Sequence, residues 1–417
     1  MSTRTARRRT TRGLEQVPVE RQRSGERQTR RVLRRRKIRQ SIFTLGIGLD
    51  LPLFLLTCVL LAIGLVVLFS ASYSYSYSYY GDSYMFIGRQ AFFAVLGVVA
   101  MLFLSTFNYH NFHQLCGIIF LATVGLLVAV LLFKGTAIVP VKGGANRWIN
   151  LGFIEFQPSE IAKFALVVML AHMISMMGER AKTFKQGFLP CVAVVGLILL
   201  LVVAEKHISA TLIIALIAFI VMFIGGVRVR YFVPIGVLAG GALAGLILFS
   251  DKFAYALNRI KGWIDPFNPP EGVDTYQTVQ SLYAIGSGRL LGVGLGQSRQ
   301  KHLYLPEPQN DFIFAIACEE LGFIGALVII LLFAMLIWRG VYVSLRAKDT
   351  FGTLLGIGIT FTIGLQAVFN ICVVTNALPN TGISLPFFSY GGTSLIILLC
   401  EIGVLLSISR GAYVEKT

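Results

Sequence analysis

Charged residues are scarce in this sequence of 417 residues. Asp, Glu, Lys and Arg together make up 14% of it, whereas 55% of the residues are hydrophobic. Soluble domains carry about 25% charged residues, so this composition excludes an ordinary soluble globular fold. The apolar residues fall in blocks of about 20, the length that crosses roughly 30 Å of hydrocarbon. The sequence therefore predicts an all-α polytopic membrane protein.

Acidic residues are rarer than basic ones, 20 against 37, which gives a net charge of +17. Residues 1–40 contain 15 basic and 3 acidic residues, so the excess is concentrated at the N-terminus. An arginine-rich segment with few large apolar residues is typical of a disordered arm. We interpret residues 1–46 as a disordered cytoplasmic tail that binds anionic lipids beside the first span. Nucleic-acid binding is the alternative interpretation, which we do not favour.

The sequence also lacks the common motifs of metal, disulfide and hydrolase chemistry. It contains no CxxC, HExxH, SxxK or GxSxG motif, and its five histidines are scattered. All six cysteines lie in or beside apolar segments, so we expect buried thiols rather than a disulfide framework or a metal site. The glycine-rich sequence at residues 292–297 follows no strand of a βαβ unit, which argues against a dinucleotide site.

Ten apolar segments are candidate transmembrane helices. They cover residues 51–70, 90–106, 114–133, 158–177, 187–204, 208–225, 231–249, 312–338, 352–374 and 389–409. Lys and Arg in the short connections predict cytoplasmic termini and an extracytoplasmic loop after each odd-numbered segment. The ten-helix membrane domain is predicted at residues 47–410, followed by a cytoplasmic tail at 411–417. A large extracytoplasmic loop, residues 250–310, joins helices 7 and 8.

Two features of the outward-facing segments add detail. Within the large loop we expect short amphipathic helices on the membrane surface, with Gly286 and Gly288 among the glycines that interrupt regular structure. The alternating tyrosines and serines of residues 73–80 follow the first apolar segment. Tyrosine is enriched at membrane interfaces, so this run predicts an aromatic belt at the outer end of that segment.

Three carboxylates lie close together where the eighth segment begins: Asp311, Glu319 and Glu320. A carboxylate at the centre of a membrane helix is unfavourable by about 2.5–3.5 kcal/mol on insertion scales. The helix macrodipole would favour Asp311 at a helix N-terminus, but it does not explain the glutamates. These lie about 13 Å deeper, at a rise of ~1.5 Å per residue. Chemistry on a membrane-bound substrate is the leading explanation.

Further candidate residues lie in three other segments. Glu160 and Lys163 are three residues apart and share a helix face. They form either a self-compensating ion pair, or Lys163 faces a cavity and meets an anionic ligand or Asp311. Glu401 places another charge in the last apolar segment. Residues 378–394 contain two prolines and three glycines, and such irregular backbone at membrane depth predicts one wall of the same cavity.

Five ordered motifs make the sequence resemble the SEDS family of bacterial membrane proteins, which act in shape, elongation, division and sporulation. The motifs are GLVVLFSAS, GANRWINLG with QPSEIAK, YQTVQSLYAIGSG with GLGQSRQK, LPEPQNDFIFAIACEELG and LPNTGISLPFFSYGGTS. The resemblance covers nearly the whole chain after the basic tail. The sequence GLGQSRQKHLYLPE looks more like the FtsW branch than the RodA branch, and the sporulation member SpoVE shares much of this pattern.

The resemblance implies an inverting peptidoglycan glycosyltransferase that polymerises lipid II at the outer face of the cytoplasmic membrane during division. Asp311, the aspartate of the DFIFA motif, would be catalytic. It would act as general base when a GlcNAc 4-hydroxyl attacks the lipid-pyrophosphate-linked sugar. We assign substrate contacts to Arg147, Lys163, Arg259, Gln300, Lys301, Glu307 and Ser389, and structural roles to Glu160, Glu319, Glu320 and Glu401.

The resemblance also implies partners and a site of action. The partners would be a class B penicillin-binding protein, which crosslinks the new strands, and other divisome membrane proteins at the septum. Mg²⁺ or Mn²⁺ is expected to assist, with no organic cofactor, but the sequence contains no metal-ligand cluster. The family often has a Glu-Pro-Asp-like turn after the fifth segment, where this chain has Glu205, Lys206 and His207, so we carry no role over to that turn.

Two alternatives remain open. A cavity with intramembrane charges would also suit a lipid II transporter, which needs polar residues through the full depth of the bilayer. The polar residues here are weighted toward the outer side, which favours the transferase. The second alternative is a sporulation or elongation paralogue of the same polymerase family.

Overall fold

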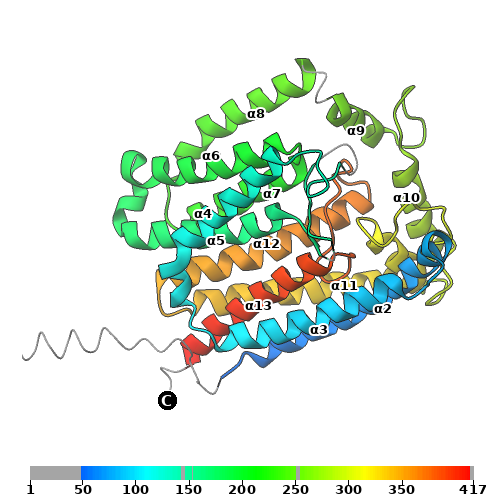
Figure 1. Ribbon diagram of the computed structural model, residues 1–417, viewed down its shortest axis with the longest axis horizontal. Coiled ribbons are helices and arrows are strands. Elements are labelled where there is room, and N and C mark those ends of the chain that lie inside the picture. Colours follow the sequence, from blue (N-terminus) through cyan, green and yellow to red (C-terminus); the bar gives the residue numbers. More distant parts are fainter. Residues whose placement is uncertain (1–47, 142–145, 153, 250–253, 414–417) are drawn as a thin grey trace, which may run out of the picture. The chain divides into compact units, whose positions relative to one another are not determined.

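The computed structural model describes residues 48–141, 146–152, 154–249 and 254–413. The basic tail predicted at residues 1–46 lies outside the described residues, as does most of the predicted C-terminal tail. The chain divides into two units, and the second, Phe43–Thr417, contains every described residue. This unit is helical, and its long helices lie side by side (Figure 1).

Within the described residues, a helix covers each of the ten predicted apolar segments. The helices are α2 (Leu51–Tyr80), α3 (Met85–Thr106), α4 (His110–Leu132), α5 (Pro158–Met177), α6 (Leu189–Ala204), α7 (Ile208–Ile224), α8 (Phe232–Phe249), α11 (Ile313–Leu345), α12 (Thr350–Val374) and α13 (Gly392–Tyr413). Eight are long and apolar enough to cross a membrane; α7 and the apolar run at the start of α8 are shorter. The protein is therefore a helical polytopic membrane protein.

The first helix shows how local sequence sets the ends of an element. The Asp50 carboxylate caps α2 by accepting a hydrogen bond from the Leu53 backbone N–H at 3.0 Å, and it also forms an ion pair with Arg339 of α11 at 2.7 Å. The helix ends at Gly81, whose φ of 72° is left-handed. The helix is longer than the predicted segment of residues 51–70, because α2 continues through the tyrosine–serine run to Tyr80.

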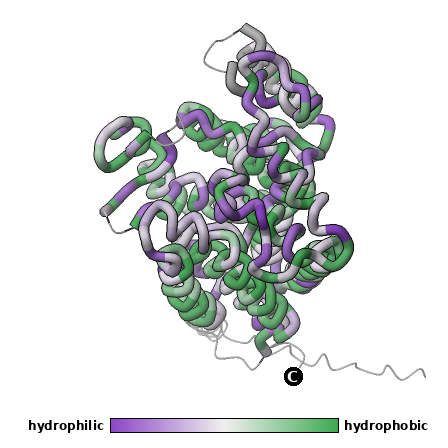
Figure 2. Tube along the Cα trace, turned by 90° about the vertical axis from the view of Figure 1, so that its right-hand side faces the viewer, coloured by the Kyte–Doolittle hydropathy of each residue, from purple (hydrophilic) through white to green (hydrophobic). Residues whose placement is uncertain are grey.

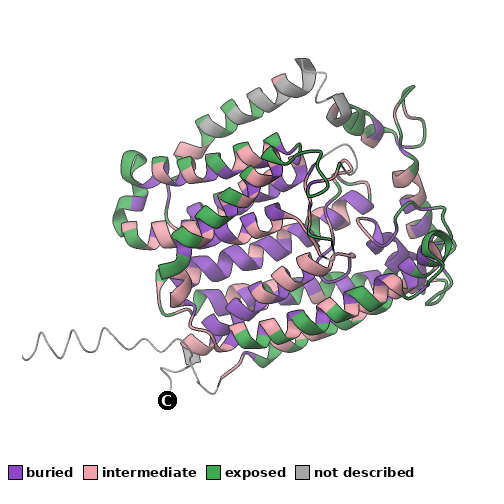
Figure 3. Cartoon of the chain, viewed as in Figure 1, coloured by how far each residue is buried: buried purple, intermediate pink, exposed green. Residues whose placement is uncertain are grey.

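The most buried of the long helices are α5, α12 and α13, while α3 exposes much of its surface (Figure 3). Helix α13 packs along α3, and α12 packs against α5 and α11. Small residues allow this approach: a Cβ added at Gly358 of α12 would lie 2.3 Å from the Val167 side chain of α5. The six cysteines are free; three are buried and Cys58, Cys372 and Cys400 are half-buried.

Three loops gather at one end of the bundle, which we call the Asp311 end. They are residues 134–157, the large loop before α11, and residues 375–391 between α12 and α13. Residues 134–157 include a hairpin of β1 (Ile149–Asn150) and β2 (Glu155–Phe156), which the all-α prediction did not include. The large loop contains two short helices, α9 (Ala254–Ile264) and α10 (Tyr276–Gly288). The expected interruption at Gly286 was wrong, because α10 continues to Gly288; the helix ends there, and the other glycines of this stretch, Gly292, Gly294 and Gly296, lie in irregular backbone as expected. Figure 2 views this end and shows hydrophilic stretches among the loops.

Helix α11 is interrupted at Gly322, and residues 289–293 of the large loop pack against it there. At Gly322 the backbone leaves helical geometry with φ 68°, and a Cβ there would lie 2.2 Å from the backbone nitrogen of Gly292. The Phe323 N–H donates to the Arg289 carbonyl at 2.9 Å, and the Val293 N–H donates to the Glu319 carbonyl at 3.0 Å. Glycine at both positions lets the loop backbone lie directly against the helix.

Candidate functional site

Asp311 lies in the turn that leads into α11, and it is half-buried. Its backbone carbonyl accepts a hydrogen bond from the Asn370 side chain of α12 at 2.7 Å. The same amide nitrogen donates to the Ile383 carbonyl at 2.7 Å. The fully buried Asn370 therefore ties the Asp311 turn to the segment that joins α12 and α13.

That joining segment, residues 375–391, forms a wall beside Asp311. The Ser389 hydroxyl donates to the Asn310 carbonyl at 2.7 Å, and the Tyr390 N–H donates to the Gln309 carbonyl at 2.9 Å. Gly382 lies beside the carboxylate, since a Cβ at this position would lie 3.1 Å from Asp311 Oδ2. The predicted proximity of this segment to Asp311 is seen, and Ser389 contacts the turn rather than open space.

The electrostatic surroundings of Asp311 suit a proton acceptor. Burial and, to a lesser extent, the nearby Glu307 carboxylate raise the pKa of Asp311, Arg259 and Arg147 oppose the rise, and the resulting pKa is about 6. Within the described residues, no side chain or backbone donor forms a hydrogen bond to the carboxylate. A base acts best when its pKa lies near the working pH. The group is therefore ionised at neutral pH and still basic enough to take a proton.

The two arginines reach the site from different loops. Arg147 donates to the Lys206 carbonyl at 2.9 Å, which fixes it on the turn between α6 and α7. Arg259, in α9, donates to the Asn380 carbonyl at 3.1 Å. Beside it, Trp263 donates to the Asn376 carbonyl at 2.9 Å, so α9 is held on the 375–391 segment. The structure thus brings two predicted substrate-binding cations to Asp311.

Lys301 lies in a different environment, inside the protein. Its ammonium group is 3.1 Å from Glu320 Oε1 and 3.0 Å from the Ser70 hydroxyl of α2. Ser70 in turn donates to Glu320 at 2.6 Å. Lys301 is buried in this network, so it is not presented at the surface as an anion-binding group in the way we expected.

Glu319 binds the loop before Asp311 through backbone groups. Its oxygens accept from the Arg299 N–H at 3.0 Å and from the Gln300 N–H at 3.4 Å. The Ser298 hydroxyl also donates to it. The two glutamates therefore hold the 298–301 loop against α11, and Gln300 contributes its backbone to this contact.

The pair on α5 is an internal ion pair. The Lys163 ammonium lies 2.8 Å from both oxygens of Glu160, and Lys163 is buried. Glu401 of α13 is buried within electrostatic reach of both. Of the two arrangements left open by the sequence, the structure shows the ion pair between Lys163 and Glu160.

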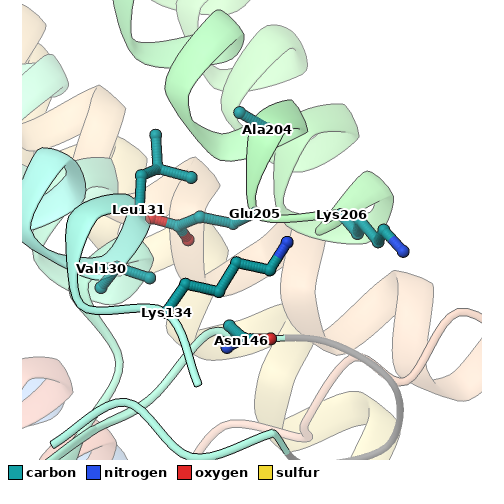
Figure 4. A pocket seen from close by; sticks show the side chains of 7 residues that line it. All are labelled: Val130, Leu131, Lys134, Asn146, Ala204, Glu205 and Lys206. Atoms are coloured by element: carbon teal, nitrogen blue, oxygen red, sulfur yellow. The ribbon is translucent and has the colours of Figure 1, made fainter. Parts of the chain in front are cut away.

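The turn between α6 and α7 packs against the hairpin loop. The His207 ring lies 3.1 Å from the Gln157 amide, and burial, with the charges of Arg147 and Lys163, lowers its pKa to about 3. Burial raises the pKa of Glu205 to about 8. Glu205 lines a cavity of about 40 Å³ with Lys134 and other residues, and its carboxylate points into that cavity while Lys206 points away (Figure 4).

Several residues that shape the site were missed from the sequence. Asn370 lies in an apolar segment where nothing local singles it out. Gly382 was included only as one of the glycines of residues 378–394, and Gln157 only as part of the QPSEIAK motif. In retrospect, a lone asparagine deep in the ninth apolar segment was the available signal, because buried amides are kept where they satisfy backbone groups.

Comparison with known proteins gives a family match over most of the chain. A family model described as "Cell cycle protein", for FtsW, RodA and SpoVE, matches residues 51–413. "Stage V sporulation protein E" of Bacillus subtilis (strain 168) is 40% identical over 361 residues, which are 87% of this chain and 97% of that protein. A protein of Geobacter sp. (strain M18) named "Probable peptidoglycan glycosyltransferase FtsW" is 37% identical over 370 residues, 88% of this chain and 98% of that protein.

Solved structures with the same fold agree with this match. A chain of the structure described as "Structural coordination of polymerization and crosslinking by a peptidoglycan synthase complex" has a TM-score of 0.72 at 24% identity, covering 88% of this chain and 99% of that chain. The rod shape determining protein RodA of Thermus thermophilus has a TM-score of 0.63 at 26% identity, covering 88% of this chain and 98% of that chain.

Proposed function

The chain belongs to the FtsW, RodA and SpoVE family of cell cycle proteins, and from this premise we propose that it is a peptidoglycan glycosyltransferase that polymerises lipid II. The observation that carries the proposal is Asp311, a half-buried carboxylate with a raised pKa at the mouth of the bundle. The Geobacter relative is named for the same activity. The polymer would be made at the septum, although the 40% identity to a sporulation protein supports a sporulation role as well.

The reaction needs the Asp311 end to face outward. In our proposal all ten helices span the cytoplasmic membrane, both termini are cytoplasmic, and the large loop between α8 and α11 is extracytoplasmic. The basic residues of the short connections at the opposite end support this orientation. Lipid II carries its sugars at the membrane surface, so Asp311 lies at the depth where those sugars arrive.

Asp311 acts as the general base in the proposed reaction. It takes the proton of the acceptor sugar's 4-hydroxyl while that oxygen bonds to the anomeric carbon of the donor. The bond from this carbon to the pyrophosphate oxygen breaks, the lipid pyrophosphate leaves, and the anomeric configuration inverts. Asp311 then returns its proton to water. Arg147 and Arg259 face the charge that grows on the leaving pyrophosphate.

A divalent cation would support the same step. In the described residues there is no group of three or more His, Cys, Asp or Glu side chains that could hold a metal ion. Mg²⁺ is commonly bound by one or two carboxylates together with substrate phosphates. Glu307, which is exposed beside Asp311, fits this mode and would hold Mg²⁺ or Mn²⁺ with the pyrophosphate. The ion would neutralise leaving-group charge.

The proposed partner is a class B penicillin-binding protein that crosslinks the new strands, together with other membrane proteins of the division machinery. The solved chain with the same fold comes from a complex described as coordinating polymerisation and crosslinking, which supports such a partnership. The basic tail would contact anionic lipids at the inner surface.

Reconstitution in lipid vesicles with lipid II and the partner tests the proposal. The wild-type protein is expected to produce glycan strands, and Asp311→Ala is expected to produce none above background. Strands made by the variant at the wild-type rate would overturn the role of Asp311 as base. Translocation of lipid II by the wild type without polymerisation would instead identify a transporter.

A further inference from the structure

The outer end of α2 carries a cluster of tyrosines that the proposed chemistry does not use. Six of the chain's 15 tyrosines lie between residues 73 and 84. Five of these are between 46% and 65% exposed: Tyr73, Tyr77, Tyr79, Tyr80 and Tyr84. Because residues 73, 77 and 80 are spaced by four and three, they share one face of the helix. We call the exposed tyrosines the tyrosine platform.

The length of α2 places most of this platform above the lipid headgroups, if the proposed orientation holds. The buried ion pair of Asp50 with Arg339 fixes the inner end of the helix. About 20 residues cross the hydrocarbon, so the apolar part ends near Ser70. At ~1.5 Å per residue, Tyr77 and Tyr80 then stand about 10 and 15 Å above the hydrocarbon. The headgroup layer on each side is only about 5–7 Å thick, and an average tilt of ~20° lowers these heights by less than a tenth.

An aromatic belt would lie within the headgroup layer, so a belt accounts for Tyr73 but not for the outer tyrosines. Lipid contact is served instead by apolar side chains further down α2, such as Val59 and Val66, which are also exposed. The outer tyrosines therefore face something other than lipid headgroups.

The platform is continuous with the Asp311 turn. Phe86 contacts Tyr80 at 5.8 Å and Tyr75 at 6.0 Å between ring centroids. On its other side Phe86 contacts Tyr390 at 4.7 Å, and Tyr390 is bound to the Gln309 carbonyl. A second link joins the Ser74 hydroxyl to the His302 ring at 3.0 Å. These contacts join the platform to the Asp311 turn, so a polymer that leaves the carboxylate on this side of the protein would pass the tyrosines.

The chemistry of the platform fits sugar rather than lipid phosphate. Residues 73–80 contain only tyrosine and serine, with no cation to bind pyrophosphate. Tyrosine offers a large, rigid ring face and a hydroxyl at its edge. The C–H face of a pyranose ring can stack on the tyrosine ring. Sugar hydroxyl and acetamido groups can form hydrogen bonds with the tyrosine hydroxyl and with the serines.

We propose that the tyrosine platform binds the amino-sugar backbone of the growing glycan strand as it leaves the Asp311 turn. The proposal rests on the proposed function and deepens it. The platform holds the strand close to the site between additions, so its loss favours early release and shorter strands.

Binding can be measured without turnover. The full-length protein in lipid nanodiscs is titrated with a short, peptide-free GlcNAc–MurNAc oligosaccharide, and the dissociation constant is measured by calorimetry. We expect Tyr77→Ala with Tyr80→Ala to weaken binding about tenfold. Tyr77→Phe with Tyr80→Phe keeps the ring faces and should retain most of the affinity. Phe92→Ala, an equally exposed aromatic change on α3, is the matched control and should bind as the wild type.

Strand length gives the second measurement, with lipid II and the partner in vesicles. The alanine pair should shorten the strands several-fold relative to the Phe92→Ala control. If the double alanine variant binds the oligosaccharide and makes strands of the same length as the Phe92→Ala control, the proposed role of the platform is overturned while the proposed function stands. If the wild type binds the oligosaccharide but never polymerises lipid II, the proposed function fails while the platform stands.

Discussion

Two carboxylates nine residues apart, Asp311 and Glu320, are treated in opposite ways by the fold. Glu320 is buried inside α11, where Ser70, Lys301 and the Ser298 N–H all contact its Oε1 atom. Asp311 is half-buried in a turn, held by its backbone carbonyl, and its side chain accepts no hydrogen bond from the described residues. Glu320 is held in the core through its Oε1 atom, whereas Asp311 is held by its backbone carbonyl and both of its carboxylate oxygens are left without a hydrogen bond from the described residues.

This difference distinguishes a carboxylate that stabilises the fold from one that is available for a reaction. Burial of a carboxylate without hydrogen-bond donors raises its pKa, and this is the situation of Asp311. We therefore assign proton transfer to Asp311 and a structural role to Glu319 and Glu320, which hold residues 298–301 against α11. We therefore expect a change at Asp311 to reduce activity without reducing stability, and a change at Glu320 to act mainly on stability.

Asp311→Asn is expected to have the largest effect on activity. The amide has the same shape but accepts no proton, so the polymerisation rate should fall by about 10²–10⁴-fold. Burial disfavours the charged form of Asp311, so removing the charge should leave the thermal unfolding midpoint equal to or above that of the wild type. A loss of activity accompanied by a lower midpoint would show that Asp311 is structural. Rates on lipid II and unfolding in detergent provide the two measurements.

Glu320→Gln should act mainly on stability. Removing one partner of a buried ion pair leaves Lys301 uncompensated, which destabilises by about 3–5 kcal/mol. Lys301→Met alone should be similarly harmful, and combining the two changes should recover part of the loss. Thermal unfolding of the four proteins measures the coupling. Additive losses in the double variant would contradict the pairing seen between these side chains.

Gly382→Ala should give a smaller, local effect. Its φ of 69° disfavours a Cβ, and that Cβ would lie 3.1 Å from Asp311 Oδ2. We expect a loss of about tenfold in rate from displacement of the carboxylate. Gly272→Ala is the matched control, because Gly272 has φ 78° but nothing within 4 Å of an added Cβ. Equal losses of activity in the two variants would mean that backbone strain, and not contact with Asp311, is responsible.

The sequence predicts the helices well where apolar blocks are long, because spanning a bilayer requires about 20 apolar residues whatever the tertiary structure. It predicts the end of α2 badly, since tyrosine and serine carry no strong stop signal and helix continues to Gly81. The prediction of Asp311 as the catalytic residue came from the family resemblance and not from any local pattern. The internal pairing of Lys301 was not predictable, because it depends on Ser70, 231 residues away. The contact of Asn370 with the Asp311 turn spans 59 residues and has no local signature either.

The pH dependence of polymerisation tests the central claim most directly, because it reports the ionisation of the free Asp311 carboxyl. A base must be unprotonated to act, so kcat/KM for lipid II should be constant above the pKa and fall as the pH drops through it. With a pKa of about 6, we predict half-maximal kcat/KM near pH 6 and about a tenfold loss for each further pH unit. The residual activity of Asp311→Asn should not show this decline. A wild-type profile that stays flat from neutral pH down to pH 5 would contradict the assignment of Asp311 as the base.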